Sequence, residues 1–599
     1  MNKKLAFILA SIIIAAATGL AVASYWNDAP VVDEVPHIGA GYTYVDRQAY
    51  LFNPEHPPLA KDLAGIPLLF LPINQNIYNQ TYQTNWPTDV NGEWNFGRTL
   101  IFHSGVNAMT LVRLARAPEL IFFILTALIV FGWARKLYDD RAAFMALLLF
   151  AFAPTVLAHA RLVTTDSAVL WGVTAATFFF IRYLQNQNRK NFWIAAIIFG
   201  LAQITKFSAF LLLPYFFGLA VVWGWVNGKI VRTTWRSIVL MIVGILVVVG
   251  PFYQFNLIHY DAQKQKADAQ VILSTYGDRL LADPVLWASD KPILRPYAEF
   301  GMGILMIFQR NAGGNQTYFL GQVYDHAVKD YFPIVYFLKE PLPFLLLLIL
   351  AVIGLFFSEH KEKEKHLKNW MREHFAEFGM LVWVLLYWLV SINANLNIGI
   401  RHLMPVYAFT AILIAGQVFK LWKIILRRRG QRMAKSYSYV IAGLLIWFLL
   451  ESLYAFPHYL PYFNELGLIK PSYAEASWLP GGQNYVVDSN VDWGQSLAEL
   501  AAWVDARNIQ QINLDYFGWA DQSYYLGNRF VWMQNGDYTS AQQFLSSHPG
   551  GGWLAVSATY YQQSLVTDHN YSWLQDYAPA AFIGNSIFVW HITPTYTLK

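Results

Sequence analysis

Two adjacent carboxylates, Asp33 and Glu34, follow the first apolar segment of the chain closely. A carboxylate at a membrane surface could take a proton from an acceptor hydroxyl, and a pair could also bind a cation. A solvated acidic loop is the alternative interpretation, and position alone favours it. The residues that surround the pair therefore decide what it does.

Three cations, Lys61, Lys206 and Arg401, lie at or near the ends of apolar segments. Charges at such places are costly, so they suggest a functional role such as binding an anion. Lys206 could instead extend its side chain to the lipid headgroups, and Arg401 could be an ordinary boundary residue. Asp166 begins another apolar segment, where it could cap a helix or belong to the same site.

Other polar residues could add to a site beside these. Glu34, Glu55 and His56 could hold a divalent cation, although so few ligands make a weak metal site. Arg113 and Arg116 stand at the start of a further apolar segment and could contact an anionic ligand.

Composition places these residues in a membrane protein. Of 599 residues, 56% are hydrophobic and 14% are charged, whereas a soluble domain has about 25% charged residues. The same composition excludes intrinsic disorder. The chain has no Cys, which excludes disulfides, thiolate metal sites and Cys nucleophiles.

Eleven segments are long and apolar enough to be transmembrane helices. We interpret the first as a retained anchor rather than a cleaved signal peptide. The predicted spans are 5–24, 111–133, 142–159, 168–184, 192–206, 208–226, 237–254, 334–357, 378–393, 402–422 and 438–456.

The distribution of charge predicts an orientation with the N-terminus inside. The connections then assigned to the cytoplasm are rich in Lys and Arg, as the positive-inside rule requires: ARKLYDDR, RYLQNQNRK, NGKIVRTTWR, SEHKEKEKHLKNWMREH and KLWKIILRRRGQRMAK. The long segments 25–110 and 255–333 are then outside. So is 457–599, which holds 11 acidic and 4 basic residues. An acidic tail behind a basic, apolar body is not typical of a nucleic-acid-binding protein.

The C-terminal segment 457–599 is predicted to form a small extracytoplasmic α/β domain that follows a membrane domain of residues 1–456. NYVVDS, QINLDYFG, WLAVSATYY and FIGNSIFVWHI are strand candidates, and GQSLAELAAWVDARN is an amphipathic helix candidate. After the first of these strands come Asp488, Asn490, Asp492 and Trp493. They could bind a ligand, but we favour turns and helix caps for them.

The stretch DEVPHIGAGYTYVDRQAYLFNPEHPPLAK resembles the first luminal loop of the protein O-mannosyltransferases and their bacterial relatives. The segments LVTTDSAVL, ITKFSAFLLLP and NIGIRHLMPVYAF are similar to further parts of the bacterial family and contain Asp166, Lys206 and Arg401. In the first loop the matching residues are Asp33, Glu34, His37, Gly39, His56, Pro57, Pro58, Leu59 and Lys61.

This resemblance implies a polytopic α-helical membrane protein of GT-C type with about 11 transmembrane helices. The implied donor is a monosaccharide on polyprenyl phosphate, and the catalytic aspartate of the family corresponds to Asp33, with Glu34 beside it. The residues implied to bind the donor phosphate are His56, Lys61, Asp166, Lys206 and Arg401. Segment 255–333 is too short for the β-trefoil domain of the eukaryotic enzymes. NPEHPPLAK also differs from the DVHPPLGK motif of those enzymes. The resemblance therefore does not imply which acceptor the protein uses.

The chemistry suits these residue types. A glycosyl phosphate already carries a good leaving group, so one base for the acceptor hydroxyl suffices, and fixed cations stabilise the departing phosphate. We expect an inverting, mannosyltransferase-like enzyme whose acceptor is a protein Ser/Thr, a lipid or a glycan. The alternative is a lipid or envelope-glycan glycosyltransferase of the aminoarabinose-transferase type. A transporter or a non-catalytic membrane receptor is a weaker hypothesis.

Overall fold

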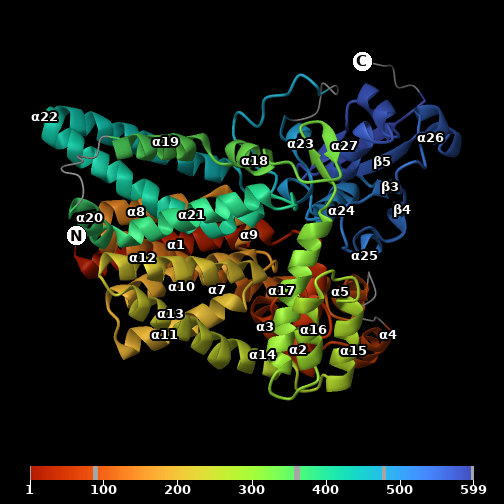
Figure 1. Ribbon diagram of the computed structural model, residues 1–599. Helices are drawn as coiled ribbons and strands as arrows, with labels where there is room; N and C mark the ends of the chain where they lie inside the picture. Colours follow the sequence, from red (N-terminus) through yellow and green to blue (C-terminus); the bar gives the residue numbers. More distant parts are fainter. Residues whose placement is uncertain (1, 85–91, 357–364, 475–480, 595–599) are drawn as a thin grey trace.

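The computed structural model describes residues 2–84, 92–356, 365–474 and 481–594. It consists of a bundle of long helices with two helical segments and a mixed β-sheet at one end (Figure 1). The N-terminus lies at the opposite end of the bundle (Figure 1). The segments predicted to be outer are therefore on one side of the bundle.

The bundle follows the predicted apolar segments. Its first half, in chain order, is α1 (Lys3–Tyr25), α6 (Ala108–Arg116), η2 (Ala117–Glu119), α7 (Leu120–Leu137), α8 (Asp140–Ala151), α9 (Pro154–His159), α10 (Asp166–Gln185), α11 (Arg189–Gln203), η3 (Phe207–Leu211) and α12 (Leu212–Val226). Its second half is α13 (Ile230–Gly244), the π-helical turn η4 (Ile245–Val249), α14 (Gly250–Asn256), α18 (Tyr331–Lys339), α19 (Leu342–Phe356), α20 (Lys365–Glu373), α21 (Phe375–Asn393), η5 (Ile400–Val406) and α22 (Tyr407–Tyr454).

By length and composition, the described residues contain seven helices able to cross a membrane, or eight if α18 and α19, bent by 114°, form one span. Within the described residues, each of the eleven predicted segments nevertheless consists mostly of helix. The numbers differ because α8 and α11 have only 12 and 15 residues. In addition, Ile400–Tyr454 contains two predicted spans, which are separated at Gly430 by a non-helical backbone. The count of eleven stays a prediction.

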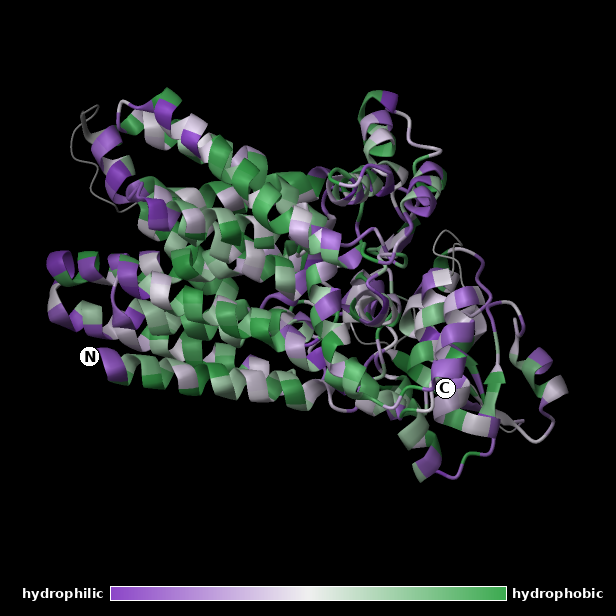
Figure 2. Ribbon diagram, turned by 90° about the horizontal axis from the view of Figure 1, so that it is seen from below, coloured by the Kyte–Doolittle hydropathy of each residue, from purple (hydrophilic) through white to green (hydrophobic). Residues whose placement is uncertain are grey.

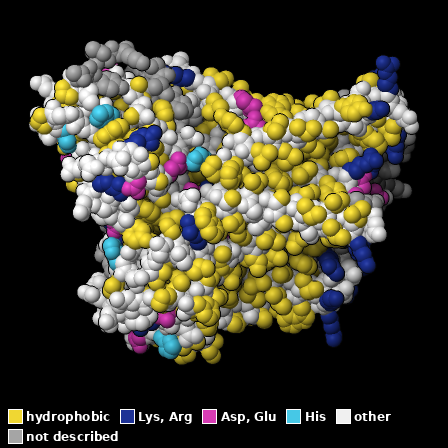
Figure 3. Space-filling view, turned by 180° about the vertical axis from the view of Figure 1, so that it is seen from behind, with side chains coloured by type: hydrophobic (Ala, Val, Ile, Leu, Met, Phe, Trp, Pro, Cys, Tyr) yellow, Lys and Arg dark blue, Asp and Glu magenta, His cyan; other side chains and the backbone are white. Residues whose placement is uncertain are grey.

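Apolar and basic side chains are distributed as a membrane protein requires. Hydrophobic residues dominate the middle of the bundle, whereas its ends and the sheet region carry more hydrophilic residues (Figure 2). Seen from behind, apolar side chains form a broad band, and Lys and Arg gather along the margin on the N-terminal side (Figure 3). The protein is a multi-pass membrane protein.

The two long segments between spans form helices packed at the end of the bundle. The first contains α2 (Glu34–Arg47), α3 (Pro58–Gly65), η1 (Ile66–Phe70), α4 (Gln75–Thr84) and α5 (Gly92–His103). The second contains α15 (Ala262–Ile272), α16 (Arg279–Ala288), α17 (Arg295–Gly313) and the hairpin β1 (Thr317–Phe319) and β2 (Gln322–Tyr324). Helices α2 and α3 touch backbone to backbone, since a Cβ on Gly41 would lie 2.1 Å from the Lys61 carbonyl oxygen.

The C-terminal segment contains a five-stranded sheet in the order β4-β3-β5-β7-β6. Strands β4, β3 and β5 are parallel, and β7 runs antiparallel to β5 and β6. The elements are α23 (Gly481–Tyr485), η6 (Asp488–Asn490), α24 (Leu497–Ala506), β3 (Ile512–Asp515), α25 (Gln522–Leu526), η7 (Gly527–Arg529), β4 (Phe530–Trp532), α26 (Ala541–Ser547), β5 (Gly552–Ser557), α27 (Ala558–Val566), η8 (Ser572–Asp576), β6 (Ala581–Ile583) and β7 (Ile587–Ile592).

Most of the predicted elements of this segment are present, and one is wrong. NYVVDS is not a strand: its first residues end α23, and Val486 makes only an isolated bridge to Phe319. WLAVSATYY is a strand only as far as Ser557, because α27 begins at Ala558. FIGNSIFVWHI contains a whole hairpin, β6 and β7, rather than one strand.

Candidate active site

Four of the predicted site residues form a chain of ion pairs. Asp33 Oδ2 lies 2.8 Å from Arg401 Nη1, and the same nitrogen lies 3.5 Å from Asp166 Oδ2. Asp166 Oδ1 lies 2.5 Å from Lys206 Nζ. Residues separated by as many as 368 positions are thus brought together with alternating charge.

Each member of the chain stands at the end of a helical element. Asp33 directly precedes α2, Asp166 is the first residue of α10, Lys206 directly precedes η3, and Arg401 lies in the first turn of η5. Thr165, before Asp166, has a φ of 65°, which is uncommon for a β-branched residue. Such local strain is typical of functional sites.

Asp33 is the accessible member of this chain. Its side chain is 25% exposed, compared with 8% for Arg401 and 1% for Asp166. Burial raises the pKa of Asp33, but the charge of Arg401, the nearby His37 and the hydrogen bond from Arg401 together outweigh that effect and hold the pKa below its ordinary value. Asp33 is therefore ionised at neutral pH and open to a ligand.

The cluster retains unused hydrogen-bonding capacity. Among the described residues, Arg401 Nη2 has no acceptor, and Lys206 Nζ donates only to Asp166. Several buried polar atoms of adjacent residues also lack a partner within the described part of the chain: Thr164 Oγ1, Thr165 Oγ1, Ser167 Oγ, His402 Nε2 and His56 Nδ1. Buried polar atoms are normally satisfied, so such a group indicates a place for a polar ligand or water.

His37 lies close to Asp33, and His56 packs against His37. His37 Nδ1 is 2.7 Å from the carbonyl oxygen of Val163, which assigns the proton to Nδ1 and leaves Nε2 as an acceptor. Burial lowers the pKa of His37 to about 4, so the ring is neutral at pH 7. His56 packs edge-on against His37 with ring centroids 5.0 Å apart.

Lys61, which the sequence predicts as a phosphate contact, lies outside the ion-pair chain. Its side chain is 0% exposed, and Nζ donates to the backbone oxygens of Asn53 and His56, to Asn53 Oδ1 and to the Tyr44 hydroxyl. These acceptors outnumber the three ammonium hydrogens. Burial also lowers the pKa of Lys61 to about 7. Lys61 thus holds the turn before α3 and has no donor left for a phosphate.

Glu34 is likewise buried, and it points away from Asp33 into an ion pair with Arg116. The two side chains make a two-point contact, Nε to Oε1 at 2.8 Å and Nη2 to Oε2 at 2.5 Å. Arg116 gives its other hydrogens to the backbone oxygens of Tyr25, Asp28 and Ala29. All five of its N–H groups are therefore used within the protein.

The remaining predicted candidates are not part of the ion-pair chain. Arg113 donates to the Trp26 carbonyl at 2.8 Å and lies over the Trp26 ring. The described residues contain no group of three or more His, Asp or Glu that could hold a metal ion. In the predicted metal set of Glu34, Glu55 and His56, the Glu34 oxygens are already engaged by Arg116.

The segment 488–495 packs directly against the ion-pair chain. The Trp493 ring lies 4.2 Å from the Arg401 guanidinium carbon, and Asn490 Oδ1 accepts from the Ile400 amide at 3.0 Å. Ser489 donates to the Ile398 carbonyl at 2.6 Å. A Cβ on Gly399 would lie 2.1 Å from Ser489 Oγ, so this contact requires glycine. The residues interpreted as turns and caps thus also support Arg401.

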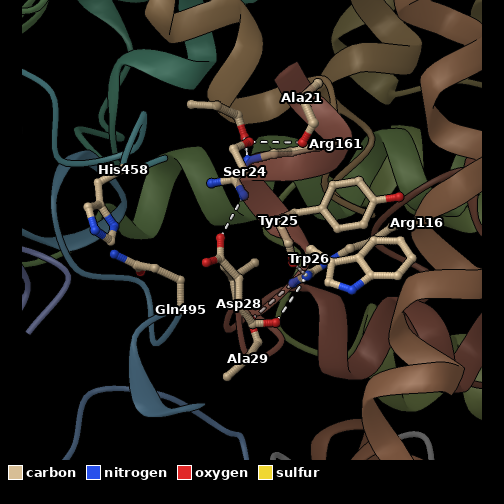
Figure 4. Close-up of polar contacts among 12 residues, drawn as sticks. Ala21, Ser24, Tyr25, Trp26, Asp28, Ala29, Arg116, Arg161, His458 and Gln495 are labelled. Atoms are coloured by element: carbon tan, nitrogen blue, oxygen red, sulfur yellow. Dashed lines mark hydrogen bonds and ion pairs between the residues drawn. The ribbon is translucent and has the colours of Figure 1, made fainter. Parts of the chain in front are cut away.

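A further, partly buried ion pair, which the sequence does not reveal directly, lies nearby. Arg161 Nη1 is 2.6 Å from Asp28 Oδ2, and the backbone oxygen of Asp28 accepts from Arg116. Gln495 and His458, both from the C-terminal segment, lie beside this pair (Figure 4). The signal was available: Arg161 is a basic residue in a connection that the topology places outside, where such residues are rare.

The comparisons with known proteins agree with the resemblance described above. Residues 105–253 match the family model described as Dolichyl-phosphate-mannose-protein mannosyltransferase. This segment, about a quarter of the chain, includes Asp166 and Lys206. No curated protein matches the chain.

The chain is also similar to solved structures, at low identity. ArnT from Cupriavidus metallidurans bound to undecaprenyl phosphate is 12% identical with a TM-score of 0.46, covering 98% of each chain. The Pmt1-Pmt2 protein O-mannosyltransferase complex of S. cerevisiae, bound to the sugar donor, is 11% identical with a TM-score of 0.48, covering 75% of this chain and 90% of that one. The Archaeoglobus fulgidus oligosaccharyltransferase tethered with an acceptor peptide is 11% identical with a TM-score of 0.47, covering 96% and 72%.

The family model and the quoted motifs overlap in the segment that supplies two members of the ion-pair chain. Over residues 105–253 the chain therefore resembles the dolichyl-phosphate-mannose-protein mannosyltransferases.

Proposed function

We propose that the protein transfers a monosaccharide from a polyprenyl-phosphate donor to an acceptor hydroxyl outside the membrane, with inversion at the anomeric carbon. The observation that carries this proposal is the chain Asp33–Arg401–Asp166–Lys206 at the ends of four helical elements. It offers an exposed carboxylate beside cations that have free donors. The family description makes mannose the first donor sugar to test.

Asp33 is the proposed base. The acceptor oxygen attacks the anomeric carbon, the bond from that carbon to the phosphate oxygen breaks, and the acceptor proton passes to Asp33. An ionised, accessible carboxylate is required for this step, and Asp33 is both. His37 Nε2 is a further acceptor that could orient the hydroxyl.

Arg401 and Lys206 are the proposed contacts of the donor phosphate. Arg401 Nη2 and two hydrogens of Lys206 are free to donate to phosphate oxygens, and both cations can stabilise the charge that develops on the leaving group. Asp166 holds the two cations in place through its ion pairs. His56, whose Nδ1 lacks a partner among the described residues, is a candidate for a contact to the donor.

We reassign two predicted residues in this proposal. Lys61 is a structural lysine that fixes the turn before α3 and not a phosphate contact. Glu34 positions α2 through Arg116 and does not touch the reacting atoms.

The experiment compares Asp33→Asn with Asp46→Asn in purified protein supplied with a polyprenyl-phosphate sugar. Asp46 lies in α2, which Asp33 precedes, and its side chain is 28% exposed, so it is a matched control. We expect Asp33→Asn to lose roughly 10²- to 10⁴-fold in transfer, as removal of a general base does. Asp46→Asn should keep the wild-type rate. Wild-type transfer by folded Asp33→Asn would contradict the proposal.

A further inference from the structure

A polar pocket of about 480 Å³ lies in the C-terminal segment, at the carboxyl ends of the parallel strands. Asp515 ends β3, Gln534 and Asn535 follow β4, and the helix α27 after β5 supplies Gln563 and Ser564. These strands and α27 lie together at the end of the molecule away from the N-terminus (Figure 1).

The strand order gives this edge the position at which open α/β sheets typically bind ligands. From β3 the chain leads out through α25 to β4 on one side, and from β5 it leads through α27 to β6 and β7 on the other side. The outgoing connections of two neighbouring parallel strands therefore diverge. Ligands of open α/β sheets bind in the crevice that such divergence opens.

The lining is polar, aromatic and poor in charge. Amides and hydroxyls line much of the pocket, Asp515 is its one carboxylate, and neither Lys nor Arg lines it among the described residues. The ring of Trp532, 65% exposed at the end of β4, stands at this pocket with Tyr516 and Tyr560. Without cations the pocket is not suited to a phosphate or a carboxylate.

Part of this polar lining is available to a ligand. No hydrogen bond of the Gln534 or Gln563 side-chain amides occurs within the described part of the chain. Asp515, by contrast, is fixed, because its Oδ2 accepts from the Tyr571 hydroxyl at 2.7 Å. An amide both donates and accepts, so it can pair with a hydroxyl of either orientation.

The pocket is also connected to the candidate active site. Gln316, which lines it, precedes Thr317, whose hydroxyl donates to the Asn397 carbonyl at 3.1 Å. Asn397 lies in the loop between α21 and η5 that leads to Arg401, and Ser489 donates to the Ile398 carbonyl in the same loop. The pocket is therefore linked through Gln316 and Thr317 to the loop that precedes Arg401.

We propose that this pocket binds a neutral saccharide, with Trp532 stacking on a sugar ring and the amides of Gln534 and Gln563 binding its hydroxyls. Free amides, an exposed aromatic ring and the lack of cations fit sugar hydroxyls and the apolar C–H face of a pyranose. If the proposed transfer is correct, the saccharide belongs to a glycan acceptor. A separate glycan that anchors the protein without accepting a sugar would present the same hydroxyls and pyranose face to the pocket.

Saturation-transfer NMR on the full chain in nanodiscs tests the site, with methyl α-mannoside, methyl α-glucoside, methyl β-galactoside and maltose as probes. We expect signal transfer to at least one probe and a loss of at least about tenfold in affinity for Trp532→Ala and for Gln563→Ala, roughly 1.4 kcal/mol. Trp287→Ala is the matched control, since Trp287 is 60% exposed on α16, outside the pocket. It should bind like the wild type.

The two sources of saccharide and the two proposals are separable. A raised acceptor KM in Trp532→Ala assigns the saccharide to the acceptor, whereas an unchanged KM with lost binding assigns it to a separate glycan. Asp33→Asn should keep probe binding while it loses transfer. Absence of signal for all four probes, or equal affinities in wild type and Trp532→Ala, would overturn the pocket proposal and leave the transfer proposal standing.

Discussion

At the scale of single residues, the site depends on which charges are already compensated. Arg116 and Lys61 are as buried as Arg401, but their donors are used within the protein. Within the described part of the chain, Arg401 and Lys206 keep unused donors although each has a carboxylate partner. The sequence predicts all four members of the ion-pair chain, but it cannot show which cations are compensated, because their partners are distant in the sequence.

The pH dependence of transfer should report the pair formed by Asp33 and Arg401. Asp33 must be ionised to take a proton, so kcat/KM should fall only as the pH drops through its lowered pKa. In Arg401→Gln the attraction is lost while burial, which raises the pKa, remains. The acid limb of the kcat/KM profile should therefore move to higher pH.

The profile is measured on the residual activity of Arg401→Gln, and Arg113→Gln is the control. Arg113 binds the Trp26 carbonyl and lies outside the ion-pair chain. An acid limb that stays in place in Arg401→Gln would show that Asp33 is not the titrating base.

At the scale of elements, the site is built where helices begin. The amphipathic and apolar patterns predict these helices well, since burial and lipid exposure determine them locally. The predicted strand NYVVDS fails for a tertiary reason. Ser489, its last residue, donates to the Ile398 carbonyl in the loop before Arg401, and Asn490, directly after it, donates to the Tyr331 hydroxyl. Hydrophobic alternation contains no information about such long-range contacts.

The ion pair of Glu34 and Arg116 should be the strongest single tie between α2 and α6. Both side chains are 0% exposed, and breaking a buried pair by removing one partner costs about 3–5 kcal/mol. Glu34→Gln should therefore unfold markedly earlier than the wild type in thermal or denaturant titrations. Breaking the exposed pair of Asp46 and Arg47 with Asp46→Asn should lower the free energy of unfolding by less than about 1 kcal/mol. Equal stability of Glu34→Gln and wild type would refute this role.

At the scale of the whole molecule, the long inter-span segments and the C-terminal sheet gather at one end of the bundle (Figure 1). Lys and Arg gather along the margin at the other end (Figure 3). Composition and loop charge predict this polarity, because partition between lipid and water acts on whole segments. The α8 and α11 helices are harder to predict, since tertiary packing allows helices shorter than a simple span.

This arrangement predicts an N-in, C-out topology. A reporter fused after Lys599 that is active only outside the cytoplasm should give signal, and a cytoplasmic reporter at the same place should not. The reverse pair of results would place the C-terminal sheet and the ion-pair chain on the cytoplasmic side and contradict this topology.

The most direct test of the donor site is the KM for the polyprenyl-phosphate sugar in three variants, with acceptor saturating. Losing one charge-assisted contact costs roughly 1.5–3 kcal/mol, which is roughly 10- to 150-fold. Lys206→Ala and Arg401→Ala should each raise the donor KM by that factor. Lys61→Met, which removes an equally buried but fully engaged cation, should leave the donor KM unchanged in the folded fraction. A wild-type donor KM in both Lys206→Ala and Arg401→Ala, or an equal rise in Lys61→Met, would contradict the assignment of the ion-pair chain as the phosphate site.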